Sequence, residues 1–235
     1  MVTMASRSLR WCVMCICVVT VLGGWVARDL SVTSRHALSS FDPHEVARLE
    51  TAAWRSYYAH EKLHLFTQMG ELLRTQYHMP FWRSWVAAYH AAHAAVVFQP
   101  GHNRAEYERA LPDLVRFFAL VRKGSETDFP VNRVAKLELD WWIVHRERAW
   151  RRPGDLERAL AAVQAEIFQQ PESRFEEHAK ARAEAMTLRD TRAEAGSVSD
   201  DDWYHIHTLL DRSWVSLRVS VAAANQPVLA RQSTP

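Results

Sequence analysis

Residues 42–57 read DPHEVARLETAAWRSY, and they combine a helix start with a helical pattern. Asp42 is an N-cap acceptor, Pro43 stands at the first helical position, and Glu45 follows the cap by three residues, which together form a capping box. Apolar side chains then recur at spacings of three and four residues, the period of an amphipathic helix. We therefore predict a long helix that begins at Pro43 and ends near Tyr77.

Similar signals divide the rest of the chain into further helical segments. Proline cannot continue a helix and glycine frees the backbone to turn, so the Pro-Gly and Gly-Ser pairs of the chain mark breaks. Predicted helices run from Pro80 to Phe98, Asn103 to Lys123, Phe129 to Arg151, Asp155 to Gln169, Pro171 to Ala195, and Ser199 to Ala224. Strand-type alternation is missing and the loops are short. We predict one all-α domain, a single-domain bundle of about six to seven helices over residues 41–224, followed by a disordered tail over 225–235.

An apolar run from Trp11 to Val26 precedes this domain, with Arg7 and Arg10 before it and Arg28 and Asp29 after it. Lysine and arginine resist translocation, so this charge pattern predicts that residues 1–10 stay in the cytoplasm. A transmembrane helix is predicted over 11–27, in contact with the lipid bilayer, and a linker over 28–40. The helical domain is then expected outside the cytoplasmic membrane, in the periplasm of a bacterial cell.

The length of the apolar run does not decide whether the segment is retained in the membrane or cleaved off. Sixteen helical residues fall somewhat short of a hydrocarbon core of about 30 Å, although local bilayer thinning closes such a gap. Val21 and Gly23 are small enough for a signal peptidase, whereas Ala27 has bulky Trp25 two positions upstream. The favoured interpretation is a retained signal anchor, and the alternative is a cleaved signal peptide.

Composition narrows the classes of function. All three cysteines, Cys12, Cys15 and Cys17, lie inside the apolar run, so the domain can form no internal disulfide and must be held together by its core. The formal net charge is +2, and acidic and basic residues are interspersed. That balance argues against a nucleic-acid partner.

Tryptophan is abundant, with ten in the chain. On helical wheels five of them fall on the apolar stripes: Trp54, Trp82, Trp141, Trp203 and Trp214. We interpret them mainly as core residues that fill space between alanine-rich helices. Stacking on a cofactor is the alternative.

Several ionisable residues share these apolar stripes, and a buried ionisable group is costly unless it is paired or bound. They are Glu50, Glu61 and His64 in the first helix, His93 in the second, Glu138 and His145 in the fourth, and His207 in the last. The favoured interpretation, which needs no cofactor, is a set of internal hydrogen-bond networks. The alternative is a metal or haem site built from Glu61, His64, Glu138 and His145, with His93 or His207.

The segment Glu61-Lys62-Leu63-His64 bears on that alternative. Its Glu-x-x-His spacing resembles the motif by which ferritin-like di-iron proteins place two ligands on one helical face, which would imply iron or manganese. Those proteins use the motif twice, and here it occurs once.

Catalytic motifs are missing from the sequence: it has no Gly-x-Ser-x-Gly, no cysteine outside the apolar run and no glycine-rich phosphate loop. We therefore predict no catalytic residues and a non-enzymatic protein. Two classes of function stay open. The favoured one is a membrane-anchored binding or assembly module with an extracytoplasmic protein partner, and the alternative is a metal- or cofactor-binding helical bundle.

Overall fold

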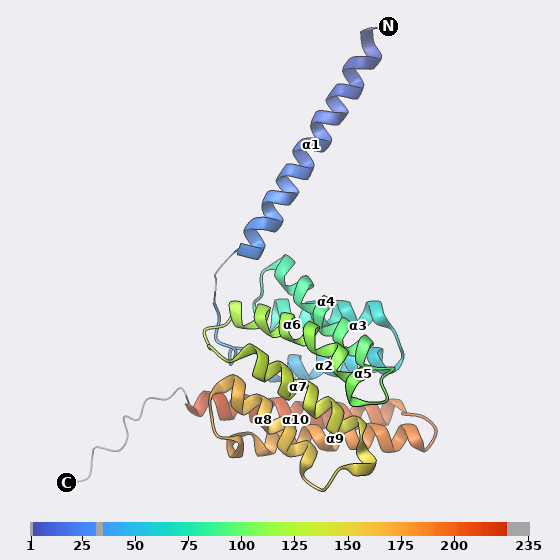
Figure 1. Cartoon of the computed structure of the whole chain (residues 1–235), viewed down its shortest axis with the longest axis vertical. Coiled ribbons are helices and arrows are strands. Elements are labelled where there is room, and N and C mark those ends of the chain that lie inside the picture. Colours follow the sequence, from blue (N-terminus) through green and yellow to red (C-terminus); the bar gives the residue numbers. More distant parts are fainter. Residues whose placement is uncertain (1, 32–34, 225–235) are drawn as a thin grey trace, which may run out of the picture.

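The computed structural model describes residues 2–31 and 35–224, so the tail predicted to be disordered lies outside the described residues. The described chain is all-α, as predicted, and contains no strand. Three short 3-10 turns, η1 (Glu108–Ala110), η2 (Arg148–Trp150) and η3 (Glu172–Phe175), accompany the α-helices (Figure 1). The helices are α1 (Val2–Ser31), α2 (Pro43–Tyr58), α3 (Lys62–Thr75), α4 (Phe81–Phe98), α5 (Arg104–Tyr107), α6 (Leu111–Lys123), α7 (Val131–Arg146), α8 (Asp155–Phe168), α9 (Glu176–Glu194) and α10 (Asp200–Ala224).

Three predicted helix starts are confirmed by their capping bonds. The Asp42 carboxylate accepts from the backbone N–H of His44 at 3.0 Å at the start of α2. Asn103 Oδ1 accepts from the N–H of residue 106 at 3.1 Å at the start of α5. The Ser199 hydroxyl accepts from the N–H of Asp202 at 3.1 Å, and the Asp202 carboxylate accepts from the N–H of Ser199 at 3.0 Å. Local side-chain chemistry thus sets where these helices begin.

The predicted helix from Pro43 to Tyr77 is wrong, because two helices occupy that stretch. α2 ends at Tyr58 and α3 begins at Lys62. Between them His60 adopts a left-handed conformation with φ of 60°, and the N–H of residue 61 bonds the carbonyl oxygen of Ser56 at 2.8 Å. Neither proline nor glycine marks this turn in the sequence, so helical periodicity alone predicts one continuous helix here.

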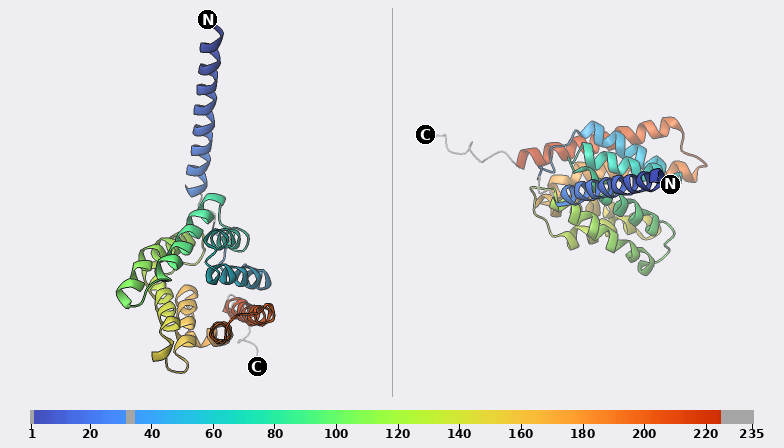
Figure 2. Two further views of the ribbon diagram at one scale, coloured as in Figure 1. Left: turned by 90° about the vertical axis from the view of Figure 1, so that its right-hand side faces the viewer. Right: turned by 90° about the horizontal axis from the view of Figure 1, so that it is seen from above.

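Eight helices of the described chain, α2, α3, α4, α6, α7, α8, α9 and α10, form a closed ring. Each packs against the next in chain order, and α10 packs against α2. The left-hand view of Figure 2 shows this order as a progression of colour around the molecule. Short connections reverse the chain between neighbours, so the carboxyl ends of α2, α4, α7 and α9 gather at one end of the ring. We call this the Arg148 end, and the opposite end, which holds the carboxyl ends of α3, α6, α8 and α10, the Phe41 end.

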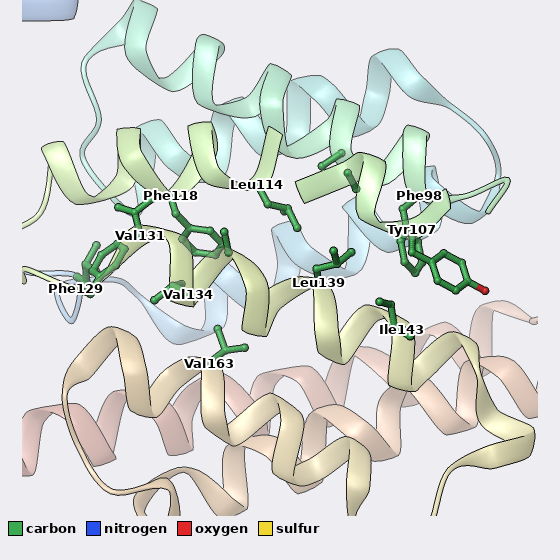
Figure 3. Close-up of a cluster of buried hydrophobic side chains, with 14 residues drawn as sticks. Phe98, Tyr107, Leu114, Phe118, Phe129, Val131, Val134, Leu139, Ile143 and Val163 are labelled. Atoms are coloured by element: carbon green, nitrogen blue, oxygen red, sulfur yellow. The ribbon is translucent and has the colours of Figure 1, made fainter. Parts of the chain in front are cut away.

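Buried apolar side chains form several clusters around the ring rather than one centre. In the cluster of Figure 3, Leu114 and Phe118 of α6 lie against Val134 and Leu139 of α7, with Val163 of α8 beyond them. Burial of this apolar surface stabilises the contacts between neighbouring helices. The segment before α2 closes the Phe41 end, where Phe41 is buried against Tyr77 and Trp214.

α1 is the one described helix that is long and apolar enough to cross a membrane, over Val13–Ser31. It is longer than the predicted span over 11–27 and takes up the first part of the predicted linker over 28–40. Figure 1 shows it standing away from the ring, which it contacts through α4 and through Lys123 of α6.

Candidate functional site

The ring surrounds a cavity of about 620 Å³, and all eight ring helices contribute to its lining. Towards the Phe41 end the lining is apolar, with Phe41, Leu72, Phe118, Val121, Ile167 and Phe168. Towards the Arg148 end it carries charged and hydrogen-bonding side chains, including Tyr58, His145, Arg148, Arg189 and Asp190. The volume lies within the range of about 300–1,000 Å³ that is typical of small-molecule sites.

A buried ion pair lies in the wall of the cavity. The Arg182 guanidinium of α9 donates from Nη1 to Glu50 Oε2 of α2 at 2.8 Å, and its Nη2 also contacts Glu50 Oε1. The indole N–H of Trp214 donates to the same carboxylate at 2.5 Å. The two charged side chains are 14% and 10% exposed, so each relies on the other in place of water.

Three tryptophan rings surround the Arg182 guanidinium. Its central carbon lies 5.7 Å from the ring centroid of Trp54 and 5.8 Å from those of Trp141 and Trp214. Cations over aromatic faces are stabilised electrostatically, and more so away from water. These tryptophans come from α2, α7 and α10, so the charge of Arg182 joins four helices at one point of the wall.

Glu138 of α7 is the second carboxyl group of this region. Its carboxylate accepts from the indole N–H of Trp142 at 3.0 Å, and Glu138 is among the residues that line the cavity. Burial raises the pKa of Glu138, and the nearby Trp141, Trp142 and Arg182 only partly oppose that shift. A carboxyl group in such surroundings can be protonated at a higher pH than usual and can then donate a hydrogen bond into the cavity.

Asp190 of α9 organises the Arg148 end. It accepts from His145 Nε2 at 2.9 Å and Arg189 Nη1 at 2.9 Å, and Arg148 Nη1 lies 3.3 Å away. Burial alone would raise the pKa of Asp190, but the hydrogen bond from His145 and the arginines outweigh it and lower that pKa. Arg189 also lies over the ring of Tyr58, 3.1 Å from its centroid. This end therefore places two arginines and a histidine around one carboxylate.

Two of the six residues proposed as metal ligands line the cavity, and the other four lie elsewhere. Glu138 and His145 both line the cavity, as predicted from their places on α7. Glu61 and His64 instead bond each other at 3.0 Å on the surface, with side chains 52% and 71% exposed. The turn at His60 explains this difference, because it resets the helical phase and α3 presents Leu65, Leu72 and Leu73 to the cavity instead.

The remaining two histidines have separate partners outside the cavity lining. His93 Nδ1 lies 2.7 Å from Asp113 Oδ2, while His90 bonds the other oxygen of the same carboxylate at 2.7 Å. His207 Nδ1 lies 3.2 Å from the Thr51 hydroxyl. Among the side chains that the structure describes, no three of His, Cys, Asp or Glu are placed so that they could hold a metal ion. The geometry therefore does not gather the six proposed ligands into one metal site.

The tryptophans on the apolar stripes serve two purposes. Trp203 is buried at 8% exposure, as expected of a core residue. Trp54, Trp141 and Trp214 are half-buried because one side of each lines the cavity. Trp82 is also half-buried and meets Trp25 of α1 edge-on, with centroids 5.3 Å apart.

Sequence reasoning missed Arg182, the cation at the centre of this arrangement. Arginine is usually a surface residue, and α9 is rich in charged residues between its alanines. A signal was present, since Arg182 shares a helical stripe with His178, Ala179 and Met186, all of which are buried.

Comparisons of this chain with protein-family models, with curated proteins and with solved structures found no match.

Proposed function

We propose that this protein is a membrane-anchored binding protein that holds a small, mostly apolar molecule inside its helical ring. The observation that carries the proposal is the cavity of about 620 Å³, to which every ring helix contributes. Interiors without a binding role are close-packed and leave few voids larger than a water molecule. A lining of aliphatic and aromatic side chains with a few convergent polar groups is the usual composition of a ligand site.

The distribution of polarity suggests how a ligand would lie. Apolar groups suit the Phe41 end, while a polar group could reach Glu138 or the Asp190 cluster towards the Arg148 end. The Glu50–Arg182 pair already satisfies both of its charges, so the wall offers no unpaired charge to a strongly charged ligand at that point. An uncharged or weakly polar molecule therefore fits best, and this favours a small-molecule site over an assembly module for a protein partner.

The membrane part of the proposal rests on α1. Arg7 and Arg10 precede the span and favour a cytoplasmic N-terminus, which would leave the ring on the extracytoplasmic side. Cleavage after Ala27 would take Trp25 away from Phe81 of α4, so this contact supports a retained anchor over cleavage at that site. We therefore favour the signal anchor over the cleaved signal peptide.

A test uses the full chain in detergent and the neutral fluorescent probe N-phenyl-1-naphthylamine, with energy transfer from tryptophan as the signal. Trp54, Trp141 and Trp214 line the cavity and would act as donors. Ala95→Phe fills the cavity from α4, whereas Val97→Phe adds the same ring at a half-buried position outside the lining. We expect saturable binding of one probe per chain, weakened at least tenfold in A95F and unchanged in V97F.

Melting temperatures of the three proteins would show that the variants are folded. Equal saturable binding by the wild type and A95F would contradict the proposal, as would the absence of saturable binding above the micelle background in the wild type.

A further inference from the structure

The last turn of α1 is held at the start of α4 by a set of polar contacts. Asp29 Oδ2 accepts from the backbone N–H groups of Trp82 at 2.6 Å and Arg83 at 3.2 Å. The carboxylate of one helix therefore caps the amino terminus of the other. The carbonyl oxygen of Leu30 accepts from Arg83 Nη2 at 3.1 Å and from Lys123 Nζ at 2.8 Å. These bonds fix where the apolar helix meets the ring.

Aromatic rings continue from α1 onto α4 next to these contacts. Trp25 stacks on Phe81 with centroids 5.6 Å apart and an interplanar angle of 21°. Phe81 in turn meets Trp82 at 5.2 Å and Trp85 at 6.1 Å. The apolar surface of the span thus passes without a gap into the first turns of α4.

The outward surface of α4 is apolar and aromatic beyond that junction. We call it the α4 outer face, and it consists of Phe81, Val86 and Tyr89, with the half-buried Trp85 at its edge against α3. Phe81 and Val86 are each 37% exposed and Tyr89 is 53% exposed. Outside α1 the described chain exposes seven large hydrophobic side chains, and four of them lie on α3 and α4: Leu63, Phe81, Val86 and Tyr89.

The charge pattern of α4 matches this surface. Residues 81–98 contain no aspartate or glutamate, although such residues are frequent elsewhere in the ring. A helix that faces only water usually carries charged residues on its outer side. Tryptophan and tyrosine are instead enriched where a protein meets the headgroup region of a bilayer, because their rings are apolar and their N–H and O–H groups are polar.

We propose that the α4 outer face lies in the headgroup region of the same bilayer that α1 crosses. This inference rests on the proposed membrane span of α1. Both side views place α4 on the side of the ring from which α1 rises, with α9 and α10 on the far side (Figures 1 and 2). The fixed junction at Asp29 keeps α4 within a few residues of the point where the span ends.

This contact gives the ring a defined orientation. The junction at Asp29 sets where α1 leaves the ring, and a second contact along α4 would hold the ring with α4 towards the lipid. Most ring helices run across the direction of α1 in Figure 1, so they would then lie along the membrane surface. The surface that this contact would bury is apolar, and its transfer from water to the membrane interface is favourable.

Spin labels on the full chain in vesicles of phosphatidylethanolamine and phosphatidylglycerol test the proposal. The native cysteines Cys12, Cys15 and Cys17 are first replaced by alanine. Single cysteines are then placed at Val86 on the α4 outer face, at Tyr204 on α10 and at Val19 in α1. Tyr204 is the matched control, since it is also an exposed large side chain, 69% exposed, on the far side of the ring.

Power saturation compares collisions of each label with oxygen, which concentrates in lipid, and with a water-soluble nickel chelate. We expect oxygen to dominate at Val19 and Val86 and nickel to dominate at Tyr204. An aqueous signal at Val86 with a lipid signal at Val19 would overturn the α4 contact alone. An aqueous signal at Val19 would overturn the anchor. Shielding of Val86 from both reagents would mean that protein covers the face, which also overturns the proposal.

Discussion

Arg182 and Glu50 depend on each other because neither has enough water to replace its partner. Removing one member of a buried ion pair typically costs about 3–5 kcal/mol, whereas replacing both by apolar groups costs far less. We expect Glu50→Leu and Arg182→Met each to lower the free energy of unfolding by about that amount. The double variant should be more stable than either single one. Urea unfolding of the four proteins in one detergent measures this cycle, and additive losses would contradict the coupling.

His178 makes the stability of the ring depend on pH. It is buried beside Ser213, whose hydroxyl donates to the His178 carbonyl oxygen at 2.9 Å, while Nδ1 lies 3.0 Å from the Ser213 carbonyl oxygen. Burial, together with the charge of Arg182, lowers the pKa of His178 to about 3. The unfolded chain, in which the pKa of histidine is about 6.5, therefore binds one more proton between pH 6.5 and about 3. Above pH 6.5 His178 is neutral in both states and does not make stability depend on pH. Below pH 6.5 the free energy of unfolding falls as the pH falls, because the unfolded chain takes up the extra proton.

The corresponding experiment replaces His178 by leucine, which leaves the Ser213 hydroxyl bonded to the residue 178 carbonyl. Between pH 7.5 and pH 5.0 we expect the wild type to lose about 2 kcal/mol more of its unfolding free energy than H178L. His205→Leu removes an exposed histidine of α10 and should respond to pH as the wild type does. Equal losses in the wild type and H178L would show that His178 is not the group responsible.

At the scale of the helix pair, α3 and α4 approach closely at Gly70. A Cβ atom built on Gly70 would lie 2.6 Å from Cε3 of the Trp85 ring, which is too close for any real contact. Alanine normally stabilises a helix interior by about 1 kcal/mol relative to glycine. Here the clash with Trp85 should outweigh the gain in helix propensity, and we expect Gly70→Ala to lower the unfolding free energy by about 1–3 kcal/mol. In a Trp85→Leu background the same change should be neutral or stabilising, and a loss of similar size there would refute the steric explanation.

Helix boundaries also show which structural features the sequence can predict. Starts with side-chain caps, such as Asp42, Asn103 and Ser199, are local chemistry and could be predicted correctly. The turn at His60 has no proline or glycine, and its left-handed residue is tolerated because α2 and α3 pack against each other. Tertiary contacts decide that boundary, so no local signal could have located it.

The turn at His60 also explains why the sequence predicts the orientation of some candidate site residues and not of others. The sequence predicts that Glu138 and His145 face inward, and this is correct because α7 is one continuous helix with one helical period. The sequence predicts the wrong face for Glu61 and His64, because the prediction extends one helical period across the turn between α2 and α3. Arg182 could have been found only by accepting a charged residue on an apolar stripe, which is rarely correct.

For the whole molecule, the all-α fold could be predicted but the ring could not. Periodicity and capping indicate that the chain is helical and roughly where most of its helices lie. They do not indicate that the first and last helices of the domain are neighbours, because that contact joins residues more than 140 positions apart, as in the bond between His44 and Asp211 at 2.6 Å. The cavity is a consequence of this closure, so it too could not be predicted.

Closure by α10 bears on how the chain acquires its structure during synthesis. Helix pairs such as α2 with α3 can form early because their contacts are local, whereas the contact of α10 with α2 must wait until almost the entire chain has been made. Joining such distant segments also carries a larger loop-closure entropy than a hairpin does. Until then the side chains that later line the cavity stay accessible in an open arc. Helper proteins that shield apolar segments would therefore act on this chain after α9 has formed and before α10 has docked.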